Sequence, residues 1–142
     1  MLAGGGGCEF TAAMVRDCAG HCAQFRWRTL GLDRWVADPW PWLCEADLVV
    51  AHAGQGAVAD IAAAGTPAIL IPAARPFGEQ HATARAVAAA GPAVTTPRWP
   101  ATDRWPGLIE QALALDGRQW TRWQVRGAPE RAAAVIAAVA GR

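Results

Sequence analysis

The side chains and main-chain groups best suited to chemistry lie within residues 46–72. A short apolar run at 47–51 predicts a strand buried on both faces of a parallel sheet, with His52 at its carboxyl end. A glycine turn follows, and apolar residues at helical spacing predict a helix over 57–64 before Pro67 starts a second strand. Ligands of open α/β sheets bind at such strand ends.

The start of this helix lacks a strong capping side chain. Gly54, Gln55 and Gly56 occupy the turn, and neither Gln55 nor Gly56 caps a helix well. The first main-chain N–H groups are therefore free to bind an anion at the positive end of the helix dipole, and a phosphate fits best. The alternative is that water satisfies these groups and the glycines only make a tight turn.

The order of residues along this region resembles the donor-binding half of GT-B glycosyltransferases, in families 1 and 28. The residues that carry the resemblance are His52, Gly54, Gly56, Asp60, Gly65, Pro67, Pro72, Glu79 and Gln80. With weaker flanks it covers about residues 4–95. The resemblance implies an α/β fold, a Rossmann-like parallel sheet flanked by helices, as a single domain of the GT-B C-terminal type.

The resemblance also implies a role for each position. The expected diphosphate-binding residues are Gly5, Gly6, His52, Gly54, Gln55, Gly56 and Ala57; Trp35 and Val36 would bind the base, Asp60 the ribose, and Glu79 and Gln80 the donor sugar. A carboxylate beside an amide suits a polyol. Other interpretations stay open. His52 could be a strand-end histidine whose hydrogen bonds are satisfied within the protein, and Asp60 could be a solvated acid on the helix surface. Glu79 and Gln80 could form the polar first turn of the next helix.

Three positions depart from the family pattern. Ala57 stands where a Ser or Thr is usual, Asp60 where a Glu is usual, and Thr83 where an Asn is usual. One phosphate-facing hydroxyl is therefore missing, and the shorter Asp60 reaches a ribose through water. These departures keep open a non-catalytic or degenerate partner domain that binds a nucleotide sugar.

Four glycines at 4–7 resemble the glycine-rich loop that opens the donor domain in the same families. They allow close approach of the backbone to a phosphate or to a facing domain. A nicotinamide fingerprint needs a third spaced glycine and an acid after the second strand, where this chain has Arg26 and Arg28. We expect no cofactor besides the nucleotide sugar substrate.

The rest of the chain is predicted to be scaffold. Asp38 and Pro39 are typical of a helix start, which would place Trp40 and Trp42 on a short helix. The other predicted elements are helices over about 10–24, 79–90, 102–115 and 130–140 and a strand over 93–95.

Composition limits the function. The 142 residues suffice for one domain, 1–142, and include no Ser, Lys, Asn or Tyr, so serine nucleophile chemistry is excluded. The net charge is +1 and the Arg residues are scattered, so the sequence lacks the basic patch that is typical of nucleic-acid binding. Cys18, His21 and Cys22 could share one helical face, but no fourth ligand is evident and we expect no metal. Few unpatterned Cys and no secretory leader indicate a reduced cytoplasm.

The resemblance implies transfer of a hexosyl group from a UDP- or dTDP-linked sugar to an acceptor hydroxyl. A GT-B transferase needs two domains, so we expect an acceptor domain or partner subunit to supply the general base, with membrane association only through that partner. No run is long enough to span a bilayer. Half of a UDP-sugar epimerase is the enzymatic alternative, although it too needs a second domain.

Overall fold

The domain is built on a parallel β-sheet. The computed structural model describes residues 1–2, 9–32 and 35–141. Three strands pair in the order β1-β2-β3, with Val50, Ile69 and Val94 in one row across them. Their bounds are β1 (Val49–Ala51), β2 (Ala68–Leu70) and β3 (Ala93–Thr95).

Leu2 extends the sheet beyond β1. Its N–H donates to Val50 O at 2.9 Å, and Leu30 N–H donates to Met1 O at 2.9 Å. Leu2 thereby forms parallel bridges with both Ala51 and Leu30. The order across the sheet is Leu30, Leu2, β1, β2, β3, all running in one direction. The predicted Rossmann-like α/β fold is confirmed.

Helices connect and cover the strands. In the described part of the chain they are α1 (Ala12–His21), α2 (Trp40–Glu45), α3 (Gln55–Ala64), α4 (Glu79–Ala90), α5 (Trp105–Leu113) and α6 (Ala128–Ala140), with short 3-10 helices η1 (Pro76–Gly78), η2 (Thr102–Arg104) and η3 (Gly117–Trp123). The predictions of α2, α4 and β3 are confirmed, and Asp38 Oδ1 accepts from Trp40 N–H at 2.9 Å at the start of α2.

Other boundaries differ from the sequence prediction for local reasons. The strand predicted over 47–51 starts at Val49, whose N–H donates to Pro67 O at 3.0 Å. The helix predicted over 10–24 starts after Thr11, whose side chain accepts from Met14 N–H. The helix predicted from 57 includes Gln55, because the glycine turn is shorter than expected. The helix predicted over 102–115 is divided between η2 and α5.

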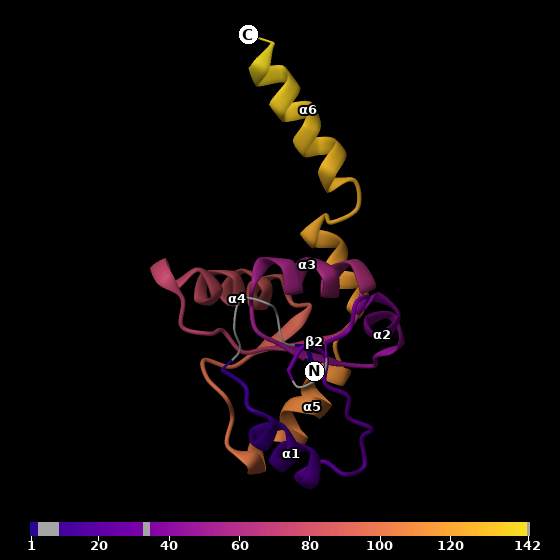
Figure 1. Ribbon diagram of the computed structural model, residues 1–142, viewed down its shortest axis with the longest axis vertical. Coiled ribbons are helices and arrows are strands. Elements are labelled where there is room, and N and C mark those ends of the chain that lie inside the picture. Colours follow the sequence, from indigo (N-terminus) through magenta and orange to yellow (C-terminus); the bar gives the residue numbers. More distant parts are fainter. Residues whose placement is uncertain (3–8, 33–34, 142) are drawn as a thin grey trace.

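The sheet is buried on both faces, as its apolar strands require. On one face Val49, Ala51, Ala68 and Leu70 pack with residues of α2, α3, α4 and η3. On the other face the alternate strand residues, such as Val50 and Ile69, pack with α1 and α5. Figure 1 shows α2, α3 and α4 on one side of the sheet and α1 and α5 on the other.

The carboxyl end of α3 is fixed by a relay of hydrogen bonds. Gly65 ends the helix with φ 70°, a left-handed conformation that favours glycine. Thr66 Oγ1 donates to Leu43 O at 3.0 Å, and Trp120 Nε1 donates to Thr66 O at 2.8 Å. These bonds join α2 and η3 to the carboxyl end of α3. They therefore help to fix the orientation of α3, and with it the position of its amino terminus.

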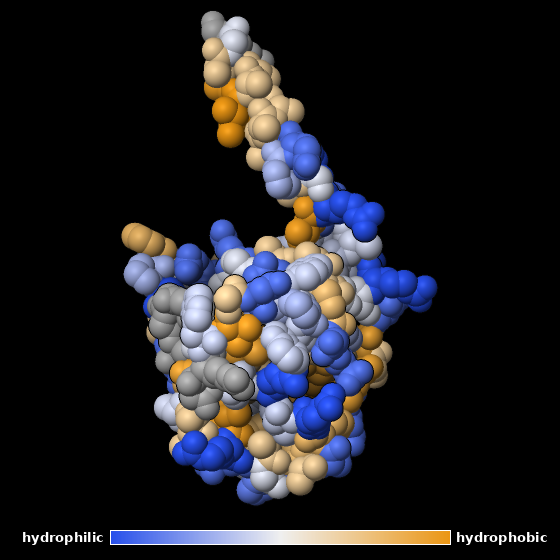
Figure 2. Space-filling model, turned by 45° about the vertical axis from the view of Figure 1, so that its right-hand side comes forward, coloured by the Kyte–Doolittle hydropathy of each residue, from blue (hydrophilic) through white to orange (hydrophobic). Residues whose placement is uncertain are grey.

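Helix α6 lies apart from this core. None of its residues is buried, and Val135, Ile136 and Val139 are 64%, 68% and 67% exposed. It projects away from the sheet to the carboxyl terminus (Figure 1), and its outer half carries apolar surface (Figure 2). Among the described residues, no helix has the length and apolar character needed to cross a bilayer.

Candidate functional site

The amino terminus of α3 presents N–H groups that the helix does not use. Gly54 is the N-cap and has no side chain to accept a bond. Val58 N–H makes the first helical bond, to Gly54 O at 3.0 Å, so Gln55, Gly56 and Ala57 precede the bonding pattern. A Cβ on Gly56 would meet no atom within 4 Å, which leaves the space beside this turn open. The predicted uncapped start is confirmed, and its geometry suits an anion.

Asp60 is exposed on the second turn of α3. It lies four residues after Gly56, and residues at that spacing share one face of a helix. Its carboxylate is therefore on the same open side as the unused N–H groups. A hydroxyl-bearing ligand attached to an anion at Gly56 would find an acceptor there, so the ribose role of Asp60 stays a prediction with suitable placement.

His52 is held by the protein on both sides of its ring. Its side chain is buried, Nδ1 lies 2.7 Å from Ile71 O, and Nε2 accepts from Glu9 N–H at 3.2 Å. Phe10 stacks on the ring at 3.8 Å between centroids. His52 is thus at the predicted strand end, but a contact from Nε2 to a diphosphate would have to replace the Glu9 bond. The diphosphate role of His52 stays a prediction.

The two predicted sugar-binding residues differ in environment. Glu79 is exposed at the first position of α4. Gln80 is only 6% exposed, and its Oε1 accepts from Ala73 N–H at 2.9 Å. Its Nε2 lies 3.6 Å from the position of a Cβ on Gly54. The structure therefore brings Gln80, from α4, beside the amino terminus of α3.

The two residues predicted to bind the base also differ in how exposed they are. Trp35 is 82% exposed, whereas Val36 is partly buried and packs against the core. An exposed indole offers a face on which a planar ring can stack. Gly5 and Gly6, the predicted glycine-loop contacts, lie outside the described residues.

Sequence reasoning missed Glu9. Its Oε1 accepts from Ala74 N–H at 2.9 Å, 65 residues along the chain, and its own N–H reaches His52. The available signal was a carboxylate directly after the glycine run. Glu9 joins the segment after that run to the loop between β2 and α4, which leads to the predicted sugar-binding residues on α4.

Cys18, His21 and Cys22, at the end of α1, do not come together as metal ligands. Cys18 and Cys22 are buried free thiols, whereas His21 is exposed with Nδ1 3.0 Å from Asp17 O. Burial raises the pKa of Cys18 to about 12. Within the described residues, no three His, Cys, Asp or Glu side chains gather as a metal site would require.

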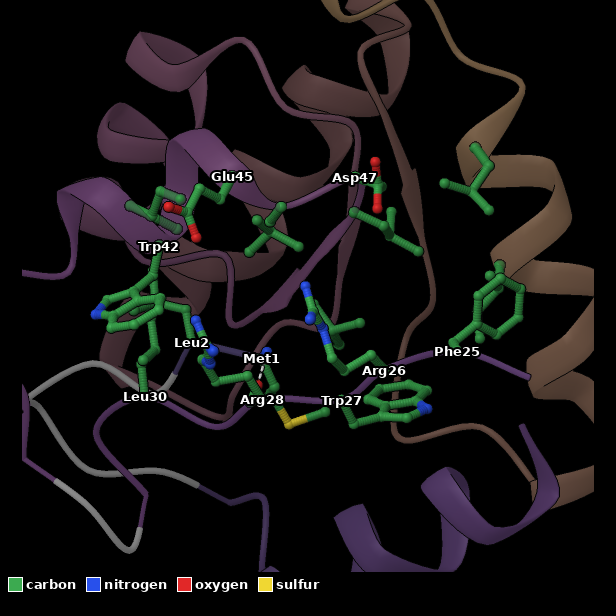
Figure 3. Close-up of a pocket in the computed structure, with 17 residues that line it drawn as sticks. Met1, Leu2, Phe25, Arg26, Trp27, Arg28, Leu30, Trp42, Glu45 and Asp47 are labelled. Carbon is green, nitrogen blue, oxygen red and sulfur yellow. Dashed lines mark hydrogen bonds between the residues drawn. The ribbon is translucent and has the colours of Figure 1, made fainter. Parts of the chain in front are cut away.

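A cavity of about 460 Å³ lies at the opposite, amino-terminal edge of the sheet. Figure 3 shows Arg26, Arg28 and Trp42 around it, with Glu45 and Asp47 also on its walls. The Arg28 guanidinium carbon lies 3.7 Å from the centroid of the Trp42 ring. Among the described residues, none of those predicted to bind ligand lines this cavity.

Comparison with known proteins identifies the family of the chain. The sequence model of the glycosyltransferase family 28 C-terminal domain matches residues 41–112, about half of the chain. The chain belongs to this family. The matched region of this family 28 domain runs from α2 into α5 and includes His52, the start of α3 and Gln80.

Curated relatives extend the comparison. The domain is 37% identical over 93 residues to the UDP-N-acetylglucosamine--N-acetylmuramyl-(pentapeptide) pyrophosphoryl-undecaprenol N-acetylglucosamine transferase of Bifidobacterium longum (strain NCC 2705), covering 60% of this chain and 23% of the relative. The protein of the same name from Paenarthrobacter aurescens (strain TC1) is 32% identical over 98 residues, covering 64% and 26%. The matches thus span about a quarter of each relative.

A solved structure supports the fold. The crystal structure of the glycotransferase of kitacinnamycin superposes on the chain with a TM-score of 0.72 and 22% sequence identity. The superposition covers 95% of this chain and 41% of that one. The family 28 domain therefore corresponds to less than half of a larger glycosyltransferase in architecture.

Proposed function

We propose that this chain is the donor-binding domain of a hexosyltransferase that uses a nucleoside diphosphate sugar. The observation that carries the proposal is the uncapped start of α3, with the Gln80 amide beside Gly54, inside the region that matches family 28. UDP-N-acetylglucosamine is the first donor to test, because the named relatives transfer N-acetylglucosamine.

The proposed donor would lie along the open side of α3. Its diphosphate would accept hydrogen bonds from the N–H groups of residues 55–57, and Asp60 would accept from ribose hydroxyls. Trp35 and Val36 would hold the base, and Glu79 and Gln80 the sugar. As the bond to the sugar breaks, negative charge grows on the diphosphate, and the positive end of α3 stabilises it in the leaving group.

An acceptor-binding domain or subunit completes the proposed enzyme. The chain spans about a quarter of its named relatives, so the rest of such a protein would supply the acceptor site and the general base. In support, the apolar residues Val135, Ile136 and Val139 of α6 are exposed. We propose that any membrane association would come through this partner, and that the domain works in the cytoplasm.

Calorimetry on the chain tests the proposal. UDP-N-acetylglucosamine and UDP should bind more tightly than uridine, because only the first two carry a diphosphate for α3. Asp60→Ala should weaken UDP binding by about 1–3 kcal/mol if its hydrogen bonds to ribose are shielded from water. Asp103→Ala removes another exposed aspartate, on η2, and serves as the control. Equal affinity for uridine and UDP would contradict the proposal.

A further inference from the structure

Three segments meet at the carboxyl edge of the sheet through side-chain bonds to main-chain groups. They are the residues after the glycine run, the end of β1, and the loop between β2 and α4. We call the bonds made by Glu9 and His52 the edge clasp: Glu9 N–H to His52 Nε2 at 3.2 Å, His52 Nδ1 to Ile71 O at 2.7 Å, and Ala74 N–H to Glu9 Oε1 at 2.9 Å.

The edge clasp fixes the protonation of His52. A carbonyl oxygen can only accept a hydrogen bond, so Nδ1 must carry the proton that reaches Ile71 O. A main-chain N–H can only donate, so Nε2 must be unprotonated to accept from Glu9. The ring is therefore neutral, in the Nδ1–H tautomer, and the stack with Phe10 holds its plane. Its Nε2 lone pair would repel a phosphate oxygen.

The loop between β2 and α4 is held at three of its residues. His52 binds Ile71 O, Gln80 Oε1 binds Ala73 N–H, and Glu9 Oε1 binds Ala74 N–H. The Gln80 side chain also faces Gly54. Because Gln80 is bonded to this loop, a shift of the loop would move the Gln80 side-chain amide relative to the start of α3. The Glu9 carboxylate thereby couples the chain before α1 to the loop that leads to Glu79 and Gln80.

We propose that Glu9 and neutral His52 are positioning residues, which set the spacing between the chain at Glu9, the end of β1 and the β2–α4 loop, and do not contact the donor. This inference rests on the proposed function, which it deepens. It replaces a direct diphosphate contact of His52 with an indirect one. The diphosphate is then bound by main-chain N–H groups, and the edge clasp holds the loop at the distance the donor needs.

Substitution of Glu9 separates positioning from charge. Glu9→Gln keeps an oxygen that accepts from Ala74 N–H, so UDP-N-acetylglucosamine should bind within about twofold of the unaltered chain. Glu9→Ala removes that acceptor and should weaken binding by about tenfold. Glu110→Ala, an exposed glutamate on α5, should change nothing. Unchanged binding by Glu9→Ala, or equal loss in both Glu9 variants, would overturn the role of Glu9.

Measurements without and with ligand distinguish this inference from the proposed function. In the free chain, exchange of the Ala74 amide hydrogen should be faster in Glu9→Ala than in Glu9→Gln, and equal rates would contradict the edge clasp even if no nucleotide binds. The imidazole ¹⁵N shifts of His52 should report the Nδ1–H tautomer before and after UDP is added. Protonation of Nε2 on UDP binding would show a direct diphosphate contact and overturn the inference.

Discussion

Gln80 and Gly54 lie against each other, although they come from different helices. The Gln80 side chain is anchored through Oε1 to Ala73 N–H at 2.9 Å, and its Nε2 lies 3.6 Å from the position of a Cβ on Gly54. One amide thus uses its acceptor to hold the β2–α4 loop and turns its donor toward the start of α3. This relationship links the two halves of the proposed donor site.

Substitutions at Gln80 should separate its two roles. Gln80→Glu keeps an oxygen for Ala73 N–H but replaces the donor with negative charge, so UDP binding should fall by at least about tenfold. Because this position is buried, the charge should also lower the melting temperature. Gln80→Ala leaves a buried N–H without its partner and should cost about 1–3 kcal/mol of unfolding free energy. Calorimetry and thermal unfolding measure the two effects. A Gln80→Glu chain that binds UDP normally would place the donor elsewhere.

Glycine substitutions test how η3 packs under α3. A Cβ on Gly117 would overlap Gly65 O, so Gly117→Ala should lower the unfolding free energy by about 1–3 kcal/mol. Gly107 lies within α5 with no atom within 4 Å of a Cβ, so Gly107→Ala should stabilise the chain by about 0.5–1 kcal/mol. Denaturant unfolding compares them. Equal stability of the two variants would mean that η3 does not pack on Gly65 as described.

The hydrophobic periodicity of the sequence and the positions of its glycines and prolines were enough to predict most helices and strands. The 79–90 helix and the 93–95 strand are observed at their predicted bounds, because Gly91 ends the helix with φ 87° and an apolar run follows. The uncapped helix start was also predictable, since it depends only on which residues occupy 54–56. These features are set by neighbours in the sequence.

Contacts between distant residues were not predictable in the same way. The partners of His52 lie 43 and 19 residues away, and the Glu9 carboxylate binds Ala74 across 65 residues. No local pattern says that a strand-end histidine will use both ring nitrogens within the protein. The exposed state of Trp35 and the buried state of Gln80 likewise depend on packing between separate elements.

Cysteine reactivity should follow burial. Burial raises the pKa of Cys18 to about 12 and also raises that of Cys22, so at neutral pH both thiols stay protonated and unreactive. Cys44 is exposed on α2. Maleimide should therefore label Cys44 rapidly and label Cys18 and Cys22 only after unfolding, as peptide mass spectrometry can show. Labelling of Cys18 at the rate of Cys44 in the folded chain would mean that α1 does not pack as described.

Polar substitutions on α6 should not destabilise the isolated chain. Val135, Ile136 and Val139 are more than half exposed and make no part of the core. Replacing all three with Ser should change the unfolding free energy of the sheet domain by no more than about 0.5 kcal/mol per site. Tryptophan fluorescence can follow this transition, since α6 itself contains no Trp. A large loss of stability would show that α6 packs against the domain.

A residue-resolved NMR titration tests most directly whether the donor binds at the amino terminus of α3. UDP-N-acetylglucosamine added to the ¹⁵N-labelled chain should shift the amide signals of Gln55, Gly56 and Ala57 most strongly, in a saturable way. Signals around the cavity at the other edge of the sheet, such as those of Arg26 and Trp42, should stay in place. Shifts concentrated at that cavity, or no saturable shift at residues 55–57, would contradict donor binding at the start of α3.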